Sequence, residues 1–374
     1  MDTNEFTSAG ILLNAIKAPY EIFEKLCENY EPDELFKGEN FWQELGLKKN
    51  KQEKLADLIS KGWHEKEFSN LEKINARFIT SKDLDYPAKL KDLSKLPAKF
   101  SPPIGLYVRG NANLSLPSVA VVGTRKCSDD ARIIATKLAK ALAERHITVI
   151  SGGARGIDSA GHRGALEADG ITISVFGTGI DRAYPAENRD LFSRILERGA
   201  IISEYPLGTG GEAWRFPDRN RIIVGMASHI VVVQSPEDGG AMPTARTAFK
   251  LKRDVWSVPG KISEEANRGS NELFNEGAKA TDTIGYFIEK IAGKNEQLNL
   301  DFNEYLEAKT EHSAPVLSDD EKIIYSLLQR QSGRLLENIE SESKLDPMAV
   351  NMALINLEAN GLITSSAGRY STTA

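Results

Sequence analysis

Short apolar runs and amphipathic stretches alternate through the middle of the chain, from residue 119 to residue 258. The apolar runs are rich in β-branched residues and have the length of buried strands. They are Val119–Val122, Thr148–Ile150, Ile171–Phe176, Ala200–Ile202, Ile230–Val233 and Val255–Val258. Most are separated by stretches with helical spacing of apolar residues, such as Asp130–Glu144 and Glu187–Glu197. This alternation predicts an α/β fold built on a doubly wound parallel sheet.

The regions on either side of this alternation have different patterns. Residues 1–78 predict short helices, and Ile104–Val108 predicts a lead-in strand at the edge of the main sheet. A polar stretch that is typical of a linker precedes three helical segments and a hairpin, which together predict a winged helix. We therefore expect a helical domain at residues 1–78, an α/β domain at 79–293, a linker at 294–315 and a winged helix at 316–374.

The stretch Thr148–Asp158, TVISGGARGID, is the first candidate for chemistry. A strand runs through Gly152 and Gly153 into a helix that begins after Gly156, and Arg155 lies in the turn. Free backbone N–H groups at such a helix start suit a phosphate, whereas the alternative interpretation is a plain tight turn. Ligands of doubly wound sheets bind at the carboxyl ends of strands. Four other strand ends extend the pattern, at Gly123-Thr124-Arg125, Gly177-Thr178-Gly179, Ser203-Glu204-Tyr205 and Gln234-Ser235.

The segment Trp214–Val224, WRFPDRNRIIV, is the second candidate. Its three arginines are interleaved with Trp214, Phe216 and Asn220. Aromatic rings stack on bases while arginines bind phosphates, which is how proteins hold single strands without reading their sequence. The alternative is that the aromatic residues are core and the arginines pair with Glu212 and Asp218. A basic stretch, Lys250, Lys252 and Arg253, follows a helix that is expected to begin near Pro243.

The charge balance changes along the chain. The net charge is −6, but residues 119–290 hold 23 lysines and arginines against 22 acidic residues, including 15 of the 20 arginines. Arginine binds phosphate through a rigid bidentate fork, so the middle of the chain is equipped for phosphates. The ends are acidic. From Val316 onward there are five basic and eight acidic residues, and Asp346–Asn360 has no lysine or arginine. We therefore expect the tail to contact protein rather than duplex DNA.

The sequence lacks the motifs that are typical of several functional classes. The first βα turn, VVGTRKCSDD, is not GxGxxG, no acidic residue closes the second strand, and no GxxxxGK[ST] loop is present. Cys27 and Cys127 show no metal or disulfide spacing. No long apolar run predicts a membrane span, and the N-terminus does not resemble a signal peptide. We expect a cytoplasmic protein without a cofactor or bound metal.

In order along the chain, VVGTR, SGGARGIDSAGHRGAL, GTGIDRAYPAEN, ISEYPLGT, FPDRNRII and DVWSVPG resemble the motifs of the DprA/Smf family of DNA-processing proteins. YPAKL and PPIGLYVRG resemble its lead-in segment, and AIKAPYEIF stands where a Gly-Ile-Gly hairpin is expected. The resemblance implies an extended Rossmann-like domain between a SAM-like helical domain and a winged helix. It also implies a non-enzymatic protein that binds single-stranded DNA, forms a homodimer and loads RecA or another partner during DNA uptake.

The residues and the resemblance together give one set of candidates for DNA or phosphate binding. They are Gly123, Arg125, Gly152, Gly153, Arg155, Gly156, Arg163, Phe216, Arg219, Asn220, Arg221 and Lys250. By resemblance, Arg125, Arg155, Arg219 and Arg221 line the DNA pocket. Two alternatives stay open: a DNA-binding or partner-restraining component of a phage-defence or toxin–antitoxin locus, and a nucleotide sensor or nucleoside-phosphate hydrolase. A hydrolase needs a carboxylate at the pocket, for which Glu204 and Asp158 are the candidates.

Overall fold

The computed structural model describes residues 6–292, 318–330, 333–359, 362–366 and 369–372. The chain forms two compact units, Met1–Glu296 and Gln297–Ala374. Within the described residues, no helix combines the length and the apolar character needed to cross a membrane.

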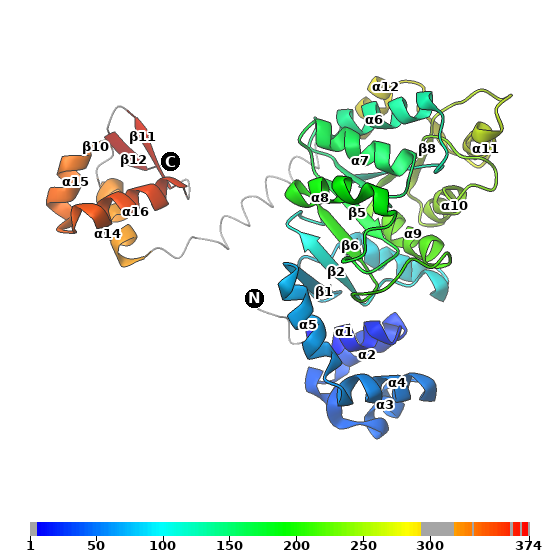
Figure 1. Cartoon of the computed structure of the whole chain (residues 1–374), viewed down its shortest axis with the longest axis horizontal. Helices are drawn as coiled ribbons and strands as arrows, with labels where there is room; N and C mark the ends of the chain where they lie inside the picture. Colours follow the sequence, from blue (N-terminus) through cyan, green and yellow to red (C-terminus); the bar gives the residue numbers. More distant parts are fainter. Residues whose placement is uncertain (1–5, 293–317, 331–332, 360–361, 367–368, 373–374) are drawn as a thin grey trace. The chain divides into compact units, whose positions relative to one another are not determined.

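A nine-stranded sheet forms the centre of the first unit (Figure 1). Its order is β1-β2-β6-β5-β4-β3-β7-β8-β9. The strands are β1 (Ala76–Thr80), β2 (Gly105–Gly110), β3 (Ser118–Val122), β4 (Thr148–Ser151), β5 (Thr172–Phe176), β6 (Ala200–Ser203), β7 (His229–Val232), β8 (Asp254–Ser257) and β9 (Lys279–Ala280). All neighbours from β6 to β9 are parallel. The predicted doubly wound α/β fold is therefore confirmed.

The predicted lead-in strand does not lie at the edge of this sheet. β2 pairs with β6 on one side and with β1 on the other, both antiparallel. β1 is the outermost strand, and its first three residues, 76–78, belong to the region for which the sequence predicts helices. The expected boundary at residue 78 consequently falls inside a strand. Short-range periodicity cannot detect β1, because its pairing partner lies about thirty residues further along the chain.

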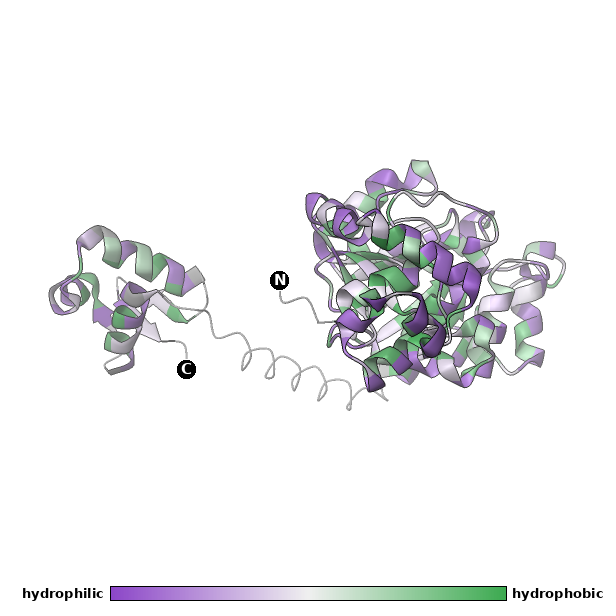
Figure 2. Ribbon diagram, turned by 90° about the horizontal axis from the view of Figure 1, so that it is seen from below, coloured by the Kyte–Doolittle hydropathy of each residue, from purple (hydrophilic) through white to green (hydrophobic). Residues whose placement is uncertain are grey.

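Helices cover both faces of the sheet (Figure 1). On one face, α6 (Asp129–Ala143), α7 (Ile157–Glu167) and α12 (Ile284–Ala292) pack on inward side chains such as Val119 and Val121. On the other face, α9 (Arg215–Met226) and α10 (Met242–Lys250) pack on Ala120 and Val122. Alternate residues of one buried strand thus enter different cores, as the pleat requires. The strands accordingly appear apolar among more hydrophilic helices in Figure 2.

The remaining helices of this unit complete its edges. α8 (Arg189–Arg198) lies beside α7, and α11 (Arg268–Asn275) lies near β8. The N-terminal helices are α1 (Thr7–Ala15), α2 (Tyr20–Asn29), α3 (Glu39–Leu45), α4 (Lys49–Ser60) and α5 (Trp63–Lys73). They enclose a small core in which the Trp42 indole donates to the Leu35 carbonyl at 2.6 Å. Ile11 and Leu71 join this region to the sheet by packing with Phe78 and Tyr107.

The second unit contains three helices and a small antiparallel sheet among its described residues. The helices are α14 (Asp319–Arg330), α15 (Leu336–Ser343) and α16 (Pro347–Ala359). The sheet has the order β10-β12-β11, formed by β10 (Arg334–Leu335), β11 (Ile363–Ser366) and β12 (Arg369–Thr372). This element order agrees with the winged-helix prediction and adds β10, which was not expected. The predicted linker lies outside the described residues.

Candidate nucleic-acid interface

A large cavity of the first unit lies where the strand order of the sheet reverses. Across the sheet, β4, β5 and β6 are added in turn on one side of β3, whereas β7, β8 and β9 are added on its other side. The loops after β3 and β7 therefore separate and leave a crevice, the usual ligand position in this fold. The cavity has a volume of about 800 Å³. Its lining includes Gly123, Thr124, Arg125, Lys126, Ala154, Asp158, Phe216, Arg219, Asn220, Gly240 and Thr244.

An aromatic and cationic cluster forms one wall of this cavity. The Phe216 ring is half-buried and stacks on Tyr184, with ring centroids 5.0 Å apart and an interplanar angle of 29°. The Arg125 guanidinium carbon lies 5.4 Å from the centroid of Phe216. Throughout the described part of the chain, Arg125 has no carboxylate partner. Arg125 is thus a cation held at an aromatic face and available to an anionic ligand.

The start of α7 is already occupied by a carboxylate of the chain itself. Asp158 is buried, and its Oδ2 accepts from the Ala154 N–H at 3.3 Å. The N–H of Ile157 donates to the Thr124 carbonyl at 3.3 Å. A phosphate at this helix start would meet the negative Asp158 where a free donor was expected. The phosphate cradle at TVISGGARGID therefore stays a prediction, and Asp158 is an internal anion that would compete with a phosphate there.

Arg219 is the buried partner of this carboxylate. Its side chain is 4% exposed, and its Nη1 donates to the carbonyls of Val175 and, at 2.7 Å, of Gly152. Burial lowers the pKa of Arg219 to about 10, and Asp158 opposes that shift. Burial also raises the pKa of Asp158, against the influence of Arg219. Arg219 lines the cavity, but its guanidinium is bonded within the fold, so its assignment as a phosphate contact stays a prediction.

The glycines of this turn have structural reasons for being glycine. A Cβ at Gly152 would lie 2.4 Å from the Arg219 guanidinium, so only glycine admits this side chain. Gly156 has φ 73° and would place a Cβ 2.3 Å from the Thr124 carbonyl. Gly153 and Gly123 are closely packed as well. The structure shows that these glycines allow close packing of neighbouring atoms on the backbone. Their assignment as phosphate contacts stays a prediction.

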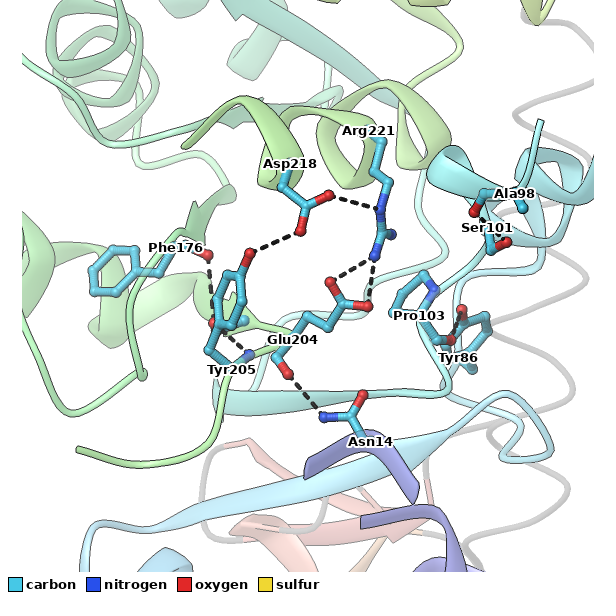
Figure 3. A network of polar contacts seen from close by, with 11 residues as sticks. Asn14, Tyr86, Ala98, Ser101, Pro103, Phe176, Glu204, Tyr205, Asp218 and Arg221 are labelled. Carbon is cyan, nitrogen blue, oxygen red and sulfur yellow. Dashed lines mark hydrogen bonds and ion pairs between the residues drawn. The ribbon is translucent and has the colours of Figure 1, made fainter. Parts of the chain in front are cut away.

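Arg221 lines a different cleft from this cavity, so its assignment as a DNA contact stays a prediction. Its Nη2 donates to both carboxylate oxygens of Glu204, at 2.5 and 2.6 Å, and Asp218 lies 3.8 Å from its Nε (Figure 3). Asp218 accepts from the Tyr205 hydroxyl at 3.0 Å, and the Glu204 carbonyl accepts from Asn14 at 2.8 Å. Residues two apart on a helix point in different directions, so Arg219 and Arg221 enter different networks.

Arg155 lies beside a second, smaller cavity of about 300 Å³, which Arg125, Tyr184 and Phe216 also line. Its guanidinium forms a two-point ion pair with Glu187, with Nη2 donating to Oε2 at 2.6 Å. Glu187 raises the pKa of Arg155, and Arg155 lowers the pKa of Glu187. Because both side chains are exposed, this ion pair is expected to be weak, and the assignment of Arg155 as a phosphate contact stays a prediction.

Two further predicted residues lie away from the cavity, and one lies in it. Arg163 is exposed on α7 and lines neither cavity described above. Lys250 ends α10, where its Nζ lies 5.6 Å from the ring centroid of Phe100. Asn220 does line the main cavity, and its amide accepts from the Arg219 Nε at 3.2 Å. Arg163 on α7 and Lys250 on α10 are basic, but their positions around these helices place their side chains outside the cavity.

The structure adds Tyr184 and Lys126 to the candidate site. Tyr184 is 45% exposed and supports Phe216 from a loop about thirty residues away in sequence. Lys126 lines the main cavity next to Arg125. The GTGIDRAYPAEN motif contained the signal for Tyr184, since an exposed tyrosine in a loop after a parallel strand is a candidate ligand contact. Nothing local to residue 184 indicated which ring it stacks on.

These features define a Rossmann-like α/β protein with an arginine-bearing and aromatic site at the switch point of its sheet. Residues 77–292, more than half of the chain, match the family described as DNA recombination-mediator protein A. The protein therefore belongs to this family, whose members are also called DprA or Smf, as the sequence motifs predicted.

Individual relatives support this membership. The chain is 34% identical over 302 residues to a putative DNA processing protein DprA of Mycobacterium tuberculosis, covering 79% of this chain and 76% of the relative. It is 38% identical over 210 residues to protein Smf of Synechocystis, covering 55% of this chain. In that case it spans only about half of the relative, 51% of its length.

Two solved structures share the fold. DprA from Streptococcus pneumoniae matches with a TM-score of 0.62 and 29% identity, covering 75% of this chain and 95% of that chain. DNA processing protein A from Helicobacter pylori, described for its unique single-stranded DNA binding mode, matches with a TM-score of 0.52 and 28% identity. This second match covers 58% of this chain and 97% of the other.

Proposed function

We propose that this protein binds single-stranded DNA in the switch-point cavity and delivers it to a RecA-type recombinase. One observation carries the DNA assignment: Arg125, a cation without a carboxylate partner in the described structure, lies against Phe216, which stacks on Tyr184. Rings of this kind stack on unpaired bases of any sequence, while the arginine binds the adjacent phosphate. Lys126 adds a second positive charge to the same wall.

Delivery to a recombinase and homodimerisation rest on family membership alone. The first is consistent with the description of the family as recombination mediators, and with the single-stranded DNA described for the Helicobacter relative. A component of a defence or toxin–antitoxin locus would use the same DNA site with a different partner. The DNA site is therefore the part of the proposal that the geometry supports.

The hydrolase alternative receives little support from the positions of its two candidate carboxylates. Both carboxylate oxygens of Glu204 accept hydrogen bonds from Arg221. Glu204 also lines a different cleft, beside the N-terminal helices. Asp158 lines the main cavity, but it is buried and accepts from the Ala154 N–H in the turn before α7. A general base needs to reach the attacking water, and both of these carboxylates are engaged within the fold.

Replacing Arg125 by alanine tests the proposal. We expect weaker binding to oligothymidylate and a salt dependence that is lower by about 0.7 log units per log unit of salt, the share of one phosphate on a single strand. Affinity is measured by anisotropy between low and physiological salt, with mononucleotides titrated in parallel. The matched control is Arg145→Ala, which removes an exposed arginine just beyond the carboxyl end of α6, at the opposite edge of the sheet.

An unchanged affinity and salt dependence in Arg125→Ala would contradict the assignment of the site. Tight mononucleotide binding without oligonucleotide binding would instead favour the nucleotide sensor. Equal losses in Arg125→Ala and Arg145→Ala would show that the effect is a general loss of positive charge.

Deletion of residues 316–374 is expected to leave the affinity for single-stranded DNA within about threefold, a change of under about 0.7 kcal/mol. α16 is the helix that a winged helix inserts into the major groove, and DNA binding requires positive charge there. Instead, α16 has no lysine or arginine and exposes Met352 and Ile355. We expect the truncation to change self-association or partner binding, measured by sedimentation. Duplex DNA binding by the isolated tail at physiological salt would contradict this prediction.

A further inference from the structure

A second aromatic and cationic pair lies at the start of α9. Trp214 precedes Phe216 by two residues, and its indole is 50% exposed. The Lys17 ammonium lies 4.3 Å from the centroid of the indole ring and 5.0 Å from the ring of Tyr205. Lys17 comes from the connection between α1 and α2, whereas Arg125 comes from the loop after β3. One helix start is thus flanked by two ring–cation pairs supplied by distant parts of the chain.

Lys17, like Arg125, forms no ion pair within the described residues. Its surroundings are mixed: Asp218 and Glu204 favour its charged form, while Arg215 and Arg221 oppose it. Burial has the largest influence and lowers the pKa of Lys17. The two neighbouring carboxylates are already engaged with Arg221 and Tyr205 (Figure 3). The charge of Lys17 therefore lies against aromatic faces and has no carboxylate of its own to bind.

The indole of Trp214 is held in place although half of its surface is open. Tyr205 contacts it edge to face at 6.5 Å between centroids, and the Arg215 guanidinium lies 5.0 Å from the indole centroid. The indole N–H donates to Glu212 at 2.5 Å, and Glu212 also pairs with Arg215. These contacts fix the orientation of the ring without covering it. A fixed, exposed tryptophan with an adjacent cation is a platform for an unpaired base and its phosphate.

We propose that Trp214 and Lys17 form a second nucleotide subsite, which receives the same single strand as the Arg125 and Phe216 cavity. The inference rests on the proposed function, since it names a further contact of that ligand. It makes the N-terminal helical region part of the DNA interface through Lys17. Binding then depends on strand length, because a mononucleotide fills one subsite and a short oligonucleotide reaches both.

Intrinsic fluorescence provides a direct test in the full-length chain. Of the four tryptophans, Trp42 and Trp256 are buried, and Trp63 packs partly buried at the N-terminal core. Stacking of a thymine on Trp214 should therefore quench the exposed part of the emission. We expect oligothymidylate to quench the wild type and to leave Trp214→Phe unquenched.

Affinity measurements on matched variants test whether Trp214 and Lys17 contribute to oligothymidylate binding. Trp214→Ala should weaken oligothymidylate binding by at least about fivefold, the lower end of the effect of one stacked base. Trp214→Phe, which keeps a ring, should remain within about threefold of the wild type. Lys17→Ala should lower the salt dependence by about 0.7 log units per log unit of salt, and Lys17→Arg should restore it. Lys54→Ala, an exposed lysine on α4, is the control for loss of charge.

The outcomes separate this inference from the proposed function. If the wild type binds no single-stranded DNA, both fail together. If Arg125→Ala weakens binding while Trp214→Ala and Lys17→Ala leave affinity and salt dependence unchanged, only the second subsite is overturned. Unfolding curves establish that each variant is folded. Two separate subsites are supported if Trp214→Ala binds a mononucleotide as tightly as the wild type but binds oligothymidylate more weakly.

Discussion

Replacement of Arg219 by alanine is expected to lower the free energy of unfolding by about 3–5 kcal/mol. The side chain is almost fully buried and donates to two carbonyls at the ends of β4 and β5. It also interacts electrostatically with the buried Asp158, whose pKa burial raises and Arg219 lowers. Removing it leaves a buried carboxylate without its charge partner and two carbonyls without this donor, and each loss destabilises the fold.

Urea denaturation of the wild type, Arg219→Ala, Asp158→Ala and the double variant measures this effect. Because the two side chains share one network, the double variant should lose less stability than the sum of the single variants. Arg145→Ala serves as an exposed-arginine control and should stay within about 0.5 kcal/mol of the wild type. A loss below 1 kcal/mol in Arg219→Ala would contradict the internal role and return Arg219 to the set of free DNA contacts.

Replacement of Phe216 by alanine is expected to weaken single-stranded DNA binding by about 1–3 kcal/mol, the contribution of one stacked base. The ring is half-buried, stacks on Tyr184 and lines both cavities. A fully buried phenylalanine would instead show its main effect as a loss of 3–5 kcal/mol in folding stability. Since part of the ring is exposed, we expect a smaller stability loss and a larger effect on DNA binding.

Thermal unfolding and a binding titration on the same preparations distinguish these cases. Phe216→Leu is the matched variant, because it keeps most of the apolar volume but has no aromatic face. It should resemble the wild type in stability and resemble Phe216→Ala in DNA affinity. A collapse of the melting temperature with unchanged affinity per folded molecule would show that Phe216 is a core residue.

Together these variants divide the arginine-rich centre into two groups. Arg219 and Arg221 each bind partners inside the fold, to which they contribute stability. Arg125 faces a cavity, and Arg155 is paired with Glu187 at its surface. Only the second group is expected to appear in the salt dependence of DNA binding, since counterion release follows phosphates that are neutralised by accessible cations.

The sequence by itself determined the doubly wound sheet and the order of its helices, and it predicted a binding site at the carboxyl ends of the strands. These properties follow from local patterns. Apolar runs such as Val119–Val122 are strands because of their length and β-branched content, and glycines at strand ends mark turns. The family was equally evident from ordered motifs, and its match to residues 77–292 confirms it.

Only the tertiary structure decided which of the similar side chains are free to bind. Arg219 and Arg221 lie in one short motif, yet Asp158 and Glu204, with which they interact, lie 61 and 17 residues earlier in the chain. The same long-range packing placed Tyr184 beneath Phe216, Lys17 over Trp214 and Asp158 at the helix start that was predicted to bind phosphate. Burial and charge pairing are set by neighbours in space, which the periodicity of a single segment does not contain.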